Sequence, residues 1–266
     1  MKSIKNVKRA VNSSFFIQDV SKKEFVVMQL NVIYEDKDIL VCFKPAGIAT
    51  QTAQLSGQDM VSLIKNYLAK KEVTKNPYVG VIHRLDQPVS GLLVFAKNQK
   101  AAGVLSKQIQ DRNANKDYIA LCSGIMNEKS GKLTHYIKKD SVTKLAKVID
   151  EQTFLGMQAE NKEETDDYKK AILSYDVEKE LGDSSIIKVY LQTGRFHQIR
   201  AQFSYISHAL LGDAKYGSQQ SRELSIKKRI NKIALCAYRL TLKHPTTGKE
   251  MEYVLSEENL PQWYKK

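Results

Sequence analysis

Residues 79–96 read VGVIHRLDQPVSGLLVFA, a polar loop between two apolar runs of strand length. The flanking runs, 79–82 and 91–96, are almost entirely apolar, as in buried β-strands. Three of the four positions 83–86 in the loop carry polar or charged side chains. Because residues between strand ends are held rigidly and still reach the surface, this loop is a suitable place for catalytic groups.

The same loop also has a purely structural interpretation. Asp86 can cap a turn that Pro88 and Gly91 close, with Arg84 as the ion-pair partner of its carboxylate. The residues alone leave both interpretations open.

Outward from this loop, short strand-like runs alternate irregularly with a few amphipathic helical patterns. We expect strands over 32–34, 39–43, 118–122, 133–137, 172–177, 186–191, 240–242 and 251–255. We expect helices over 60–68 with Asp59 as N-cap, from Asn98 to about Arg112, and over 196–206. Strict βαβ repetition is absent, which argues against a doubly wound fold. The sequence predicts an α+β fold with a mixed, mainly antiparallel sheet and flanking helices.

A second polar segment, LQTGRFHQIR at residues 191–200, opens the last predicted helix. Phe196, Ile199 and Phe203 share the spacing of one buried helical face. Backbone N–H groups at a helix start favour anions, and Arg195 and Arg200 would strengthen that preference. The alternative is an ordinary solvated basic face of the helix.

Charge points to a polyanionic partner. The 266 residues include 42 Lys and Arg against 29 Asp and Glu, a formal net charge of +13. This surplus excludes an acidic, solvating chain and favours nucleic acid as a partner, although some basic proteins are merely soluble. One acidic stretch, 157–170, interrupts the basic chain, and we interpret it as a solvated loop tip.

Cysteine usage and hydropathy argue against a disulfide-rich, zinc-binding or membrane-spanning protein. Cys42, Cys122 and Cys236 lie singly in apolar stretches, which excludes a disulfide framework and the usual structural zinc spacings. We expect small buried side chains in a reducing compartment. The longest apolar runs are far shorter than the roughly 20 residues that cross a bilayer. A cytoplasmic protein is therefore expected.

The chain shows no internal repeat and no linker rich in Pro, Gly or Ser. Residues 1–28 carry six Lys and Arg against two acidic residues, and we expect a basic extension or an edge element there. Residues 29–266 are expected to form one catalytic domain.

The chain resembles the RluA-type RNA pseudouridine synthases. Residues 83–91 match the family signature H-R-L-D-x-x-x-S-G, and residues 191–200 match L-x-T-G-R-x-H-Q-I-R. Shorter family motifs follow in order at 34–36, 44–47, 116–118, 212–217 and 237–245. The chain departs from many members at Gln87-Pro88-Val89, where they have a basic residue and Thr. The N-terminal RNA-binding domain of many relatives needs more than the 30 or so residues available, so we expect none.

The resemblance implies a specific activity. Members isomerise uridine to pseudouridine in structured RNA such as rRNA or tRNA: the N1–C1′ bond breaks, the uracil rotates while it is held, and C5 bonds to C1′. The scheme needs no cofactor and no metal, and the sequence shows no P-loop, no dinucleotide motif and no metal-ligand cluster. We expect a monomer that acts on RNA and not on membranes.

The resemblance also assigns site residues. Asp86 would be the catalytic aspartate, acting either by covalent addition to the nucleoside or by abstraction of a ribose proton to give a glycal. Arg200 would keep this carboxylate ionised. Tyr118 would stack on the extruded uracil, unless it is a core aromatic side chain, and Arg84 would hold the flipped nucleotide. Candidate phosphate-binding cations are Lys97, Lys100, Lys107, Lys138, Lys139, Arg222, Lys227, Lys228 and Arg229.

Two other activities are weighed against this one. A non-catalytic RNA-binding protein on the same scaffold would have no need of a buried aspartate beside RNA phosphates. A nucleosidase that releases uracil would need a second carboxylate to direct water, and the sequence indicates none.

Overall fold

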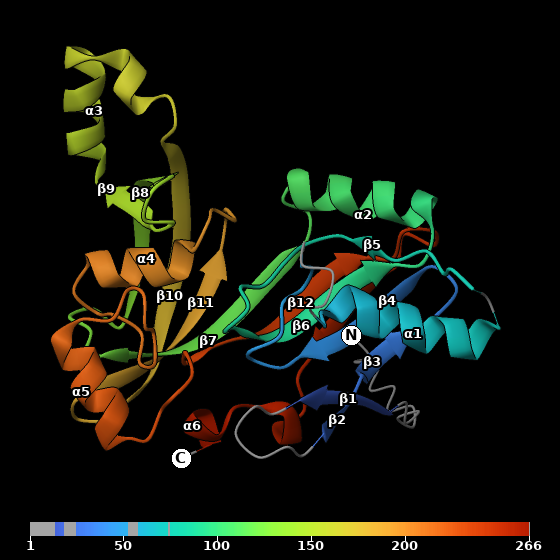
Figure 1. The fold of residues 1–266 in the computed structure, drawn as a ribbon. Coiled ribbons are helices and arrows are strands. Elements are labelled where there is room, and N and C mark those ends of the chain that lie inside the picture. The colour runs from blue at the N-terminus through green and yellow to red at the C-terminus, as the bar shows by residue number, and fades with distance from the viewer. Residues whose placement is uncertain (1–13, 19–24, 53–57, 74, 266) are drawn as a thin grey trace. The chain divides into compact units, whose positions relative to one another are not determined.

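A computed structural model describes residues 14–18, 25–52, 58–73 and 75–265 (Figure 1). The described residues divide into two compact units. The first draws on Met1–Ala114 and Thr241–Tyr253, and the second on Asn115–Leu240 and Val254–Lys266. The prediction for 1–28 lies largely outside the described residues, where only β1 (Ser14–Gln18) and β2 (Phe25–Gln29) are defined, as an antiparallel pair. The single domain expected over 29–266 stays a prediction.

The first unit is built on an antiparallel sheet. Its strands are β3 (Asn31–Glu35), β4 (Ile39–Lys44) and β6 (Ser90–Ala96), in that order, and the short β5 (Gly80–Val81) also pairs with β6. Nearly every side chain of β4 and β6 is buried, as their uninterrupted apolar sequences predict. These two strands meet the candidate catalytic loop at the Ser90 end of β6.

The helices of the first unit begin where the sequence predicts. Helix α1 (Met60–Glu72) starts after Asp59, whose carboxylate accepts from the Ser62 N–H at 2.7 Å. Helix α2 (Gln99–Gln110) starts after Asn98, whose side chain accepts from the Ala101 N–H at 2.9 Å, and packs on β5 and β6. These bonds satisfy backbone donors that have no partner within the helix. The buried residues of α1 are those of the predicted apolar face: Met60, Leu63, Ile64, Tyr67 and Leu68.

The second unit contains a longer run of antiparallel strands. Its strands are β7 (Asn115–Ser123), β8 (Ser130–Lys139), β9 (Ala146–Ile149), β10 (Lys169–Glu180) and β11 (Ser184–Leu191), in the spatial order β7-β11-β10-β8-β9. Helix α4 (Gln198–Tyr205) packs on β8 and β9, and α5 (Gln219–Lys227) packs on β7 (Figure 1). The predicted α+β fold with a mainly antiparallel sheet is confirmed.

The closing hairpin is also confirmed. Strand β12 (Leu235–Lys243) pairs with β13 (Glu250–Val254) across the turn at His244–Gly248. The chain ends in η2 (Glu257–Asn259) and α6 (Gln262–Lys265).

Three local predictions are wrong. The acidic stretch is not a loop: α3 (Glu151–Glu160) and η1 (Lys162–Thr165) cover most of it. The predicted helix over 196–206 starts only at Gln198, because His197 has a left-handed backbone with φ of 53°. Helix α5 was not predicted, since only Ser221, Leu224 and Ser225 are buried along it and no apolar period marks it.

The cysteines behave as predicted. All three are buried with free thiols, and burial raises the pKa of Cys122 to about 12. Within the described part of the chain, no helix combines the length and hydropathy that a membrane span requires.

Candidate active site

The loop that carries Asp86 is fixed by its backbone. The Thr50 hydroxyl donates to the Leu85 carbonyl at 3.0 Å, and the Leu85 N–H donates to the same hydroxyl at 3.2 Å. The Val89 N–H donates to the Asp86 carbonyl at 3.0 Å, which closes the turn. Leu85 is buried, Asp86 is half-buried and Arg84 is exposed. Asp86 therefore lies on a loop whose backbone is fixed by hydrogen bonds.

A buried lysine lies beside this loop. Lys44, at the end of β4, is fully buried, and its ammonium donates to the carbonyls of Ile48 at 2.7 Å and of Pro45 and Gln87 at 3.1 Å each. Burial lowers the pKa of Lys44 to about 8, although the nearby charge of Asp86 opposes that shift. Lys44 thus ties two loops together and places a positive charge near Asp86.

Lys44 was missed as a site residue. The sequence shows it only as the residue that follows the apolar run 39–43 and opens a short family motif. The position of Lys44 directly after a fully apolar strand could have indicated a buried lysine, because the backbone at the end of such a strand still lies in the core.

Arg200 is buried on α4 of the second unit, and its guanidinium forms a two-point ion pair. Its Nε donates to Asp213 Oδ2 at 2.7 Å and its Nη2 donates to Asp213 Oδ1 at 2.8 Å. The exposed fractions of the two side chains are only 4% and 0%. A solvated basic face is therefore the wrong interpretation for this residue. Asp213, which belongs to the 212–217 motif, was also missed.

The Asp213 carboxylate is held on several sides. The N–H groups of Lys215 and Tyr216 donate to Asp213 Oδ1 at 2.9 and 3.1 Å. Although burial raises the pKa of Asp213, the hydrogen bonds and charge of Arg200 bring that pKa below its usual value. Arg200 and Asp213 form a compensated buried pair with a fixed orientation.

Tyr216 joins Arg200 to the loop in front of α4. The Arg200 Cζ lies 5.1 Å from the centroid of the Tyr216 ring. The Tyr216 oxygen lies 2.8 Å from His197 Nδ1 and accepts from the Ala146 N–H at 2.7 Å. The first turn of α4 is thus fixed through hydrogen bonds and ring contacts.

The four predicted site residues belong to both units. Arg84 and Asp86 share the loop before β6, whereas Tyr118 on β7 and Arg200 on α4 belong to the second unit. Tyr118 is 6% exposed, which is compatible with a core aromatic side chain or with a ring that lines a site. The pairing of Asp86 with Arg200 stays a prediction.

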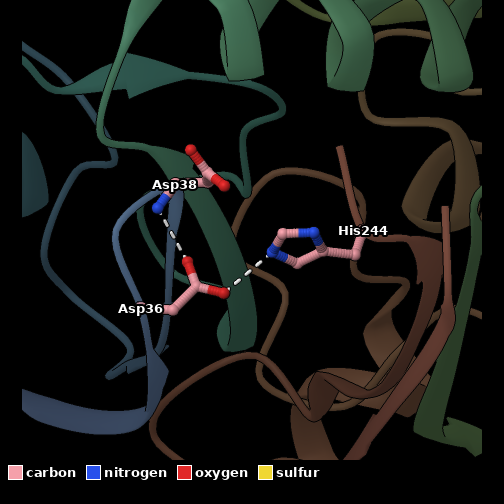
Figure 2. Close-up of side chains that lie close together, drawn as sticks. All are labelled: Asp36, Asp38 and His244. Atoms are coloured by element: carbon pink, nitrogen blue, oxygen red, sulfur yellow. Dashed lines mark hydrogen bonds and ion pairs between the residues drawn. The ribbon is translucent and has the colours of Figure 1, made fainter. Parts of the chain in front are cut away.

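One group among the described residues has metal-ligating side chains in reach of one another: Asp36, Asp38 and His244 (Figure 2). Its donor atoms are engaged in hydrogen bonds. His244 Nε2 lies 2.8 Å from Asp36 Oδ2, and Nδ1 accepts from the N–H groups of Thr246 and Thr247. Since Nδ1 is an acceptor, Nε2 carries the proton and donates to Asp36.

The carboxylates of this group are also occupied. Asp38 accepts from Asn98 at 3.0 Å and from the Thr246 hydroxyl at 2.7 Å, and Asp36 Oδ1 accepts from the Ile39 N–H at 2.8 Å. A cation would have to displace these bonds. The group is better explained as a connection between the turn after β3 and the turn after β12.

Five of the predicted phosphate-binding cations have contacts that divide them into two kinds. Lys97 is an internal ion-pair residue, since its ammonium lies 2.8 Å from both Glu35 and Glu72 and its side chain is only 10% exposed. Lys227 and Lys228 contact the Asp183 carboxylate at 3.1 and 2.7 Å. By contrast, the ammonium groups of Lys138 and Lys139 lie over the rings of Tyr168 and Phe196. The role of these cations toward RNA stays a prediction.

Comparisons with known proteins point to one family. Residues 38–205 match the family model described as RNA pseudouridylate synthase. Ribosomal large subunit pseudouridine synthase D of Vibrio parahaemolyticus is 31% identical over 89% of this chain and 70% of its own length, and that of Pasteurella multocida is 32% identical over the same shares. The solved structure titled Human RNA Pseudouridylate Synthase Domain Containing 4 superposes with a TM-score of 0.68 at 18% identity, over 88% of this chain and 90% of that one.

Proposed function

The chain belongs to the RNA pseudouridylate synthase family, and from this premise we propose that it modifies large-subunit ribosomal RNA with Asp86 as the catalytic carboxylate. Family membership makes the chain an isomerase that converts uridine in RNA to pseudouridine. The names of its ribosomal relatives support rRNA over tRNA as the target. The observation that carries the role of Asp86 is its half-buried position on a loop that Thr50 and Lys44 hold from two sides.

Isomerisation requires one bond to break and another to form. The N1–C1′ bond breaks, the uracil turns within the site, and C5 bonds to C1′, after which C5 loses its proton and N1 gains one. Asp86 either adds to the nucleoside and is displaced when C5 bonds to C1′, or removes a ribose proton and returns it as that bond forms. Both routes use the ionised carboxylate. The Lys44 ammonium supplies a positive charge near that carboxylate. Arg200, already oriented by Asp213, is the proposed second cation.

Two further residues are proposed to hold the substrate. The base must leave its stack before a side chain can reach the sugar. The Tyr118 ring offers a flat surface for the extruded uracil, and the exposed Arg84 guanidinium is proposed to bind the phosphates of the flipped nucleotide. A cytoplasmic monomer, as the sequence predicts, suits this role and stays a prediction.

Mapping pseudouridine in a strain that lacks the gene tests this proposal. Sites in large-subunit rRNA and in tRNA are compared between the parent strain, the deletion strain, and the deletion strain complemented with wild type, Asp86→Asn or Asp167→Asn. We expect one or more rRNA sites to disappear and to return with wild type and with the exposed Asp167→Asn control, but not with Asp86→Asn. Loss of a tRNA site alone would overturn the rRNA assignment, and restoration by Asp86→Asn would overturn the role of Asp86.

A further inference from the structure

An exposed aromatic side chain stands directly in front of α4. The Phe196 ring stacks on the His197 ring with a centroid distance of 3.8 Å and an interplanar angle of 23°. The Lys139 ammonium lies 5.0 Å from the Phe196 centroid. Phe196 remains 36% exposed although it is a large apolar side chain. A lone exposed phenylalanine needs no explanation, but one stacked on a second ring and approached by a cation forms a defined flat surface.

The ring beneath Phe196 is rigidly supported. His197 has a left-handed backbone with φ of 53°, an unusual conformation for a residue other than glycine. Its Nδ1 lies 2.8 Å from the Tyr216 hydroxyl, whose oxygen accepts from the Ala146 N–H. The Tyr216 hydroxyl thus contacts both the His197 ring and the backbone of β9. Because His197 is fixed from below, the Phe196 ring is held in place before any ligand arrives.

Planar groups then continue inward to the proposed active site. The Tyr216 ring meets the His197 ring edge-on, with a centroid distance of 5.5 Å. The centroid of the Tyr216 ring also lies 5.1 Å from the Arg200 Cζ. A continuous series of ring and guanidinium contacts thus leads from the exposed Phe196 to the buried Arg200–Asp213 pair.

The charge around Phe196 suits a nucleic acid. Lys139 and Arg195 are both exposed: the Lys139 ammonium lies over the ring, and Arg195 directly precedes Phe196 in the chain. The Arg195 Nε donates to the Lys170 carbonyl at 3.0 Å, which holds its guanidinium beside β10. A flat ring bordered by cations is the combination with which proteins bind single-stranded nucleic acid.

We propose that Phe196 is a stacking platform for a base of the substrate RNA other than the reacting uridine. The base would take the ring face that Lys139 approaches, and the Lys139 ammonium would move to the adjoining phosphate. This exchange is favourable because base stacking on an aromatic ring is stronger than an exposed cation–π contact. The inference rests on the proposed function, since it places the platform on the path to Arg200.

Binding of a fluorescein-labelled ten-nucleotide oligouridine, measured by anisotropy, tests the platform without any need for turnover. Phe196→Ala and Phe196→Leu are compared with Phe196→Trp, which keeps a flat ring. Leu155→Ala is the control, because Leu155 is 56% exposed on α3, where no helix residue is buried. Removal of one stacking ring is expected to raise Kd by about 5- to 150-fold. Phe196→Trp and Leu155→Ala should stay within about twofold of wild type.

The outcomes separate the platform from the proposed function. All variants are also assayed for tritium release from large-subunit rRNA labelled at uridine C5, where weaker variants should show a raised KM at a nearly unchanged kcat. If Phe196→Ala and Phe196→Leu bind the oligouridine as tightly as Leu155→Ala, the platform is overturned, whatever the wild type does with rRNA. If they bind weakly and Phe196→Trp binds well while wild type leaves rRNA unmodified, the platform stands and the rRNA target fails.

Discussion

A buried charge is costly unless several groups compensate it, and both key cations of this protein are compensated. Lys44 donates to three backbone carbonyls, whereas Arg200 faces a full carboxylate in Asp213. Burial lowers the pKa of Lys44, whereas the contact with Arg200 lowers the pKa of Asp213. Lys44 and the Arg200–Asp213 pair are therefore tested by different measurements.

Lys44 should make stability depend on pH in alkaline solution. Its pKa is about 8 in the folded protein and 10.5 in the unfolded chain, so between these values the unfolded chain binds more protons and stability rises with pH. Compared with Lys44→Met, wild type should gain up to about 1.4 kcal/mol of unfolding free energy per pH unit in that window. Urea unfolding of both proteins from pH 7 to 10.5 measures this, with the exposed Lys100→Met as control. Parallel curves for wild type and Lys44→Met would contradict the buried ammonium.

Asp213→Asn should be far more damaging than a surface change of the same kind. It leaves the Arg200 charge buried without its carboxylate, which costs about 3–5 kcal/mol. The control is Asp183→Asn, which weakens the exposed pair with Lys227 and should cost about 1 kcal/mol or less. Denaturant unfolding compares the two variants. Equal losses would show that the Arg200–Asp213 pair has no special weight.

Among the helices and strands, the sequence predicted those elements whose buried residues recur with a regular period. Helix α1 carries five apolar residues on one face and a capping aspartate, so both its face and its start were predictable. Helix α5 buries mainly serines, and α3 buries nothing, so neither shows a period. The start of α4 was misjudged because Phe196 has helical spacing but precedes His197, whose left-handed backbone delays the helix to Gln198. The contact of His197 with Tyr216 that accompanies this turn is tertiary and leaves no mark in the local sequence.

The same limit applies to the site. The loop at 83–86 and the segment at 191–200 stand out in sequence because polar residues crowd between apolar runs. The partnership of Arg200 with Asp213 does not, since they are thirteen positions apart in sequence and the contact depends on how the loop after α4 folds back. Motif matches drew attention to Lys44 and Asp213 without indicating what either residue contacts.

The cations at the end of β8 and before α4 should matter more for RNA than those at the end of α5. Lys227 and Lys228 already share Asp183, whereas Lys139 faces an aromatic ring. Changing Lys139 and Arg195 together to Ala should reduce the slope of log Kd against log salt concentration by about 1.4 to 1.8, the value for two phosphate contacts. The triple change of Lys227, Lys228 and Arg229 should reduce it by less. Measuring the Kd for RNA across a series of salt concentrations compares the two variants. A larger decrease of the slope for the triple change would show that the cations at the end of α5 matter more.

For the whole molecule, the proposed function assigns affinity for RNA to the net charge of +13 and the chemistry to one carboxylate. The group of Asp36, Asp38 and His244 could be mistaken for a metal centre, but its hydrogen bonds connect two turns that are 208 residues apart in sequence. Its function would then be to stabilise the fold.

Removal of metal ions should accordingly leave the enzyme active. Protein dialysed against EDTA is expected to convert a folded RNA substrate at an unchanged rate, and His244→Ala is expected to lower Tm without creating a metal requirement. The RNA fold is monitored in parallel, since RNA itself binds divalent cations. Loss of activity that catalytic amounts of zinc restore, with the RNA still folded, would identify the group as a functional metal site.

In the proposed function one carboxylate, that of Asp86, performs the isomerisation while other residues bind RNA. Tritium release from large-subunit rRNA labelled at uridine C5 tests this division directly, when it is measured for purified wild type and Asp86→Asn alongside their RNA affinities. Wild type is expected to release tritium at its target sites, and Asp86→Asn is expected to release none while its Kd for RNA stays within a few-fold of the wild-type value. Sustained release by Asp86→Asn would show that another group performs the chemistry.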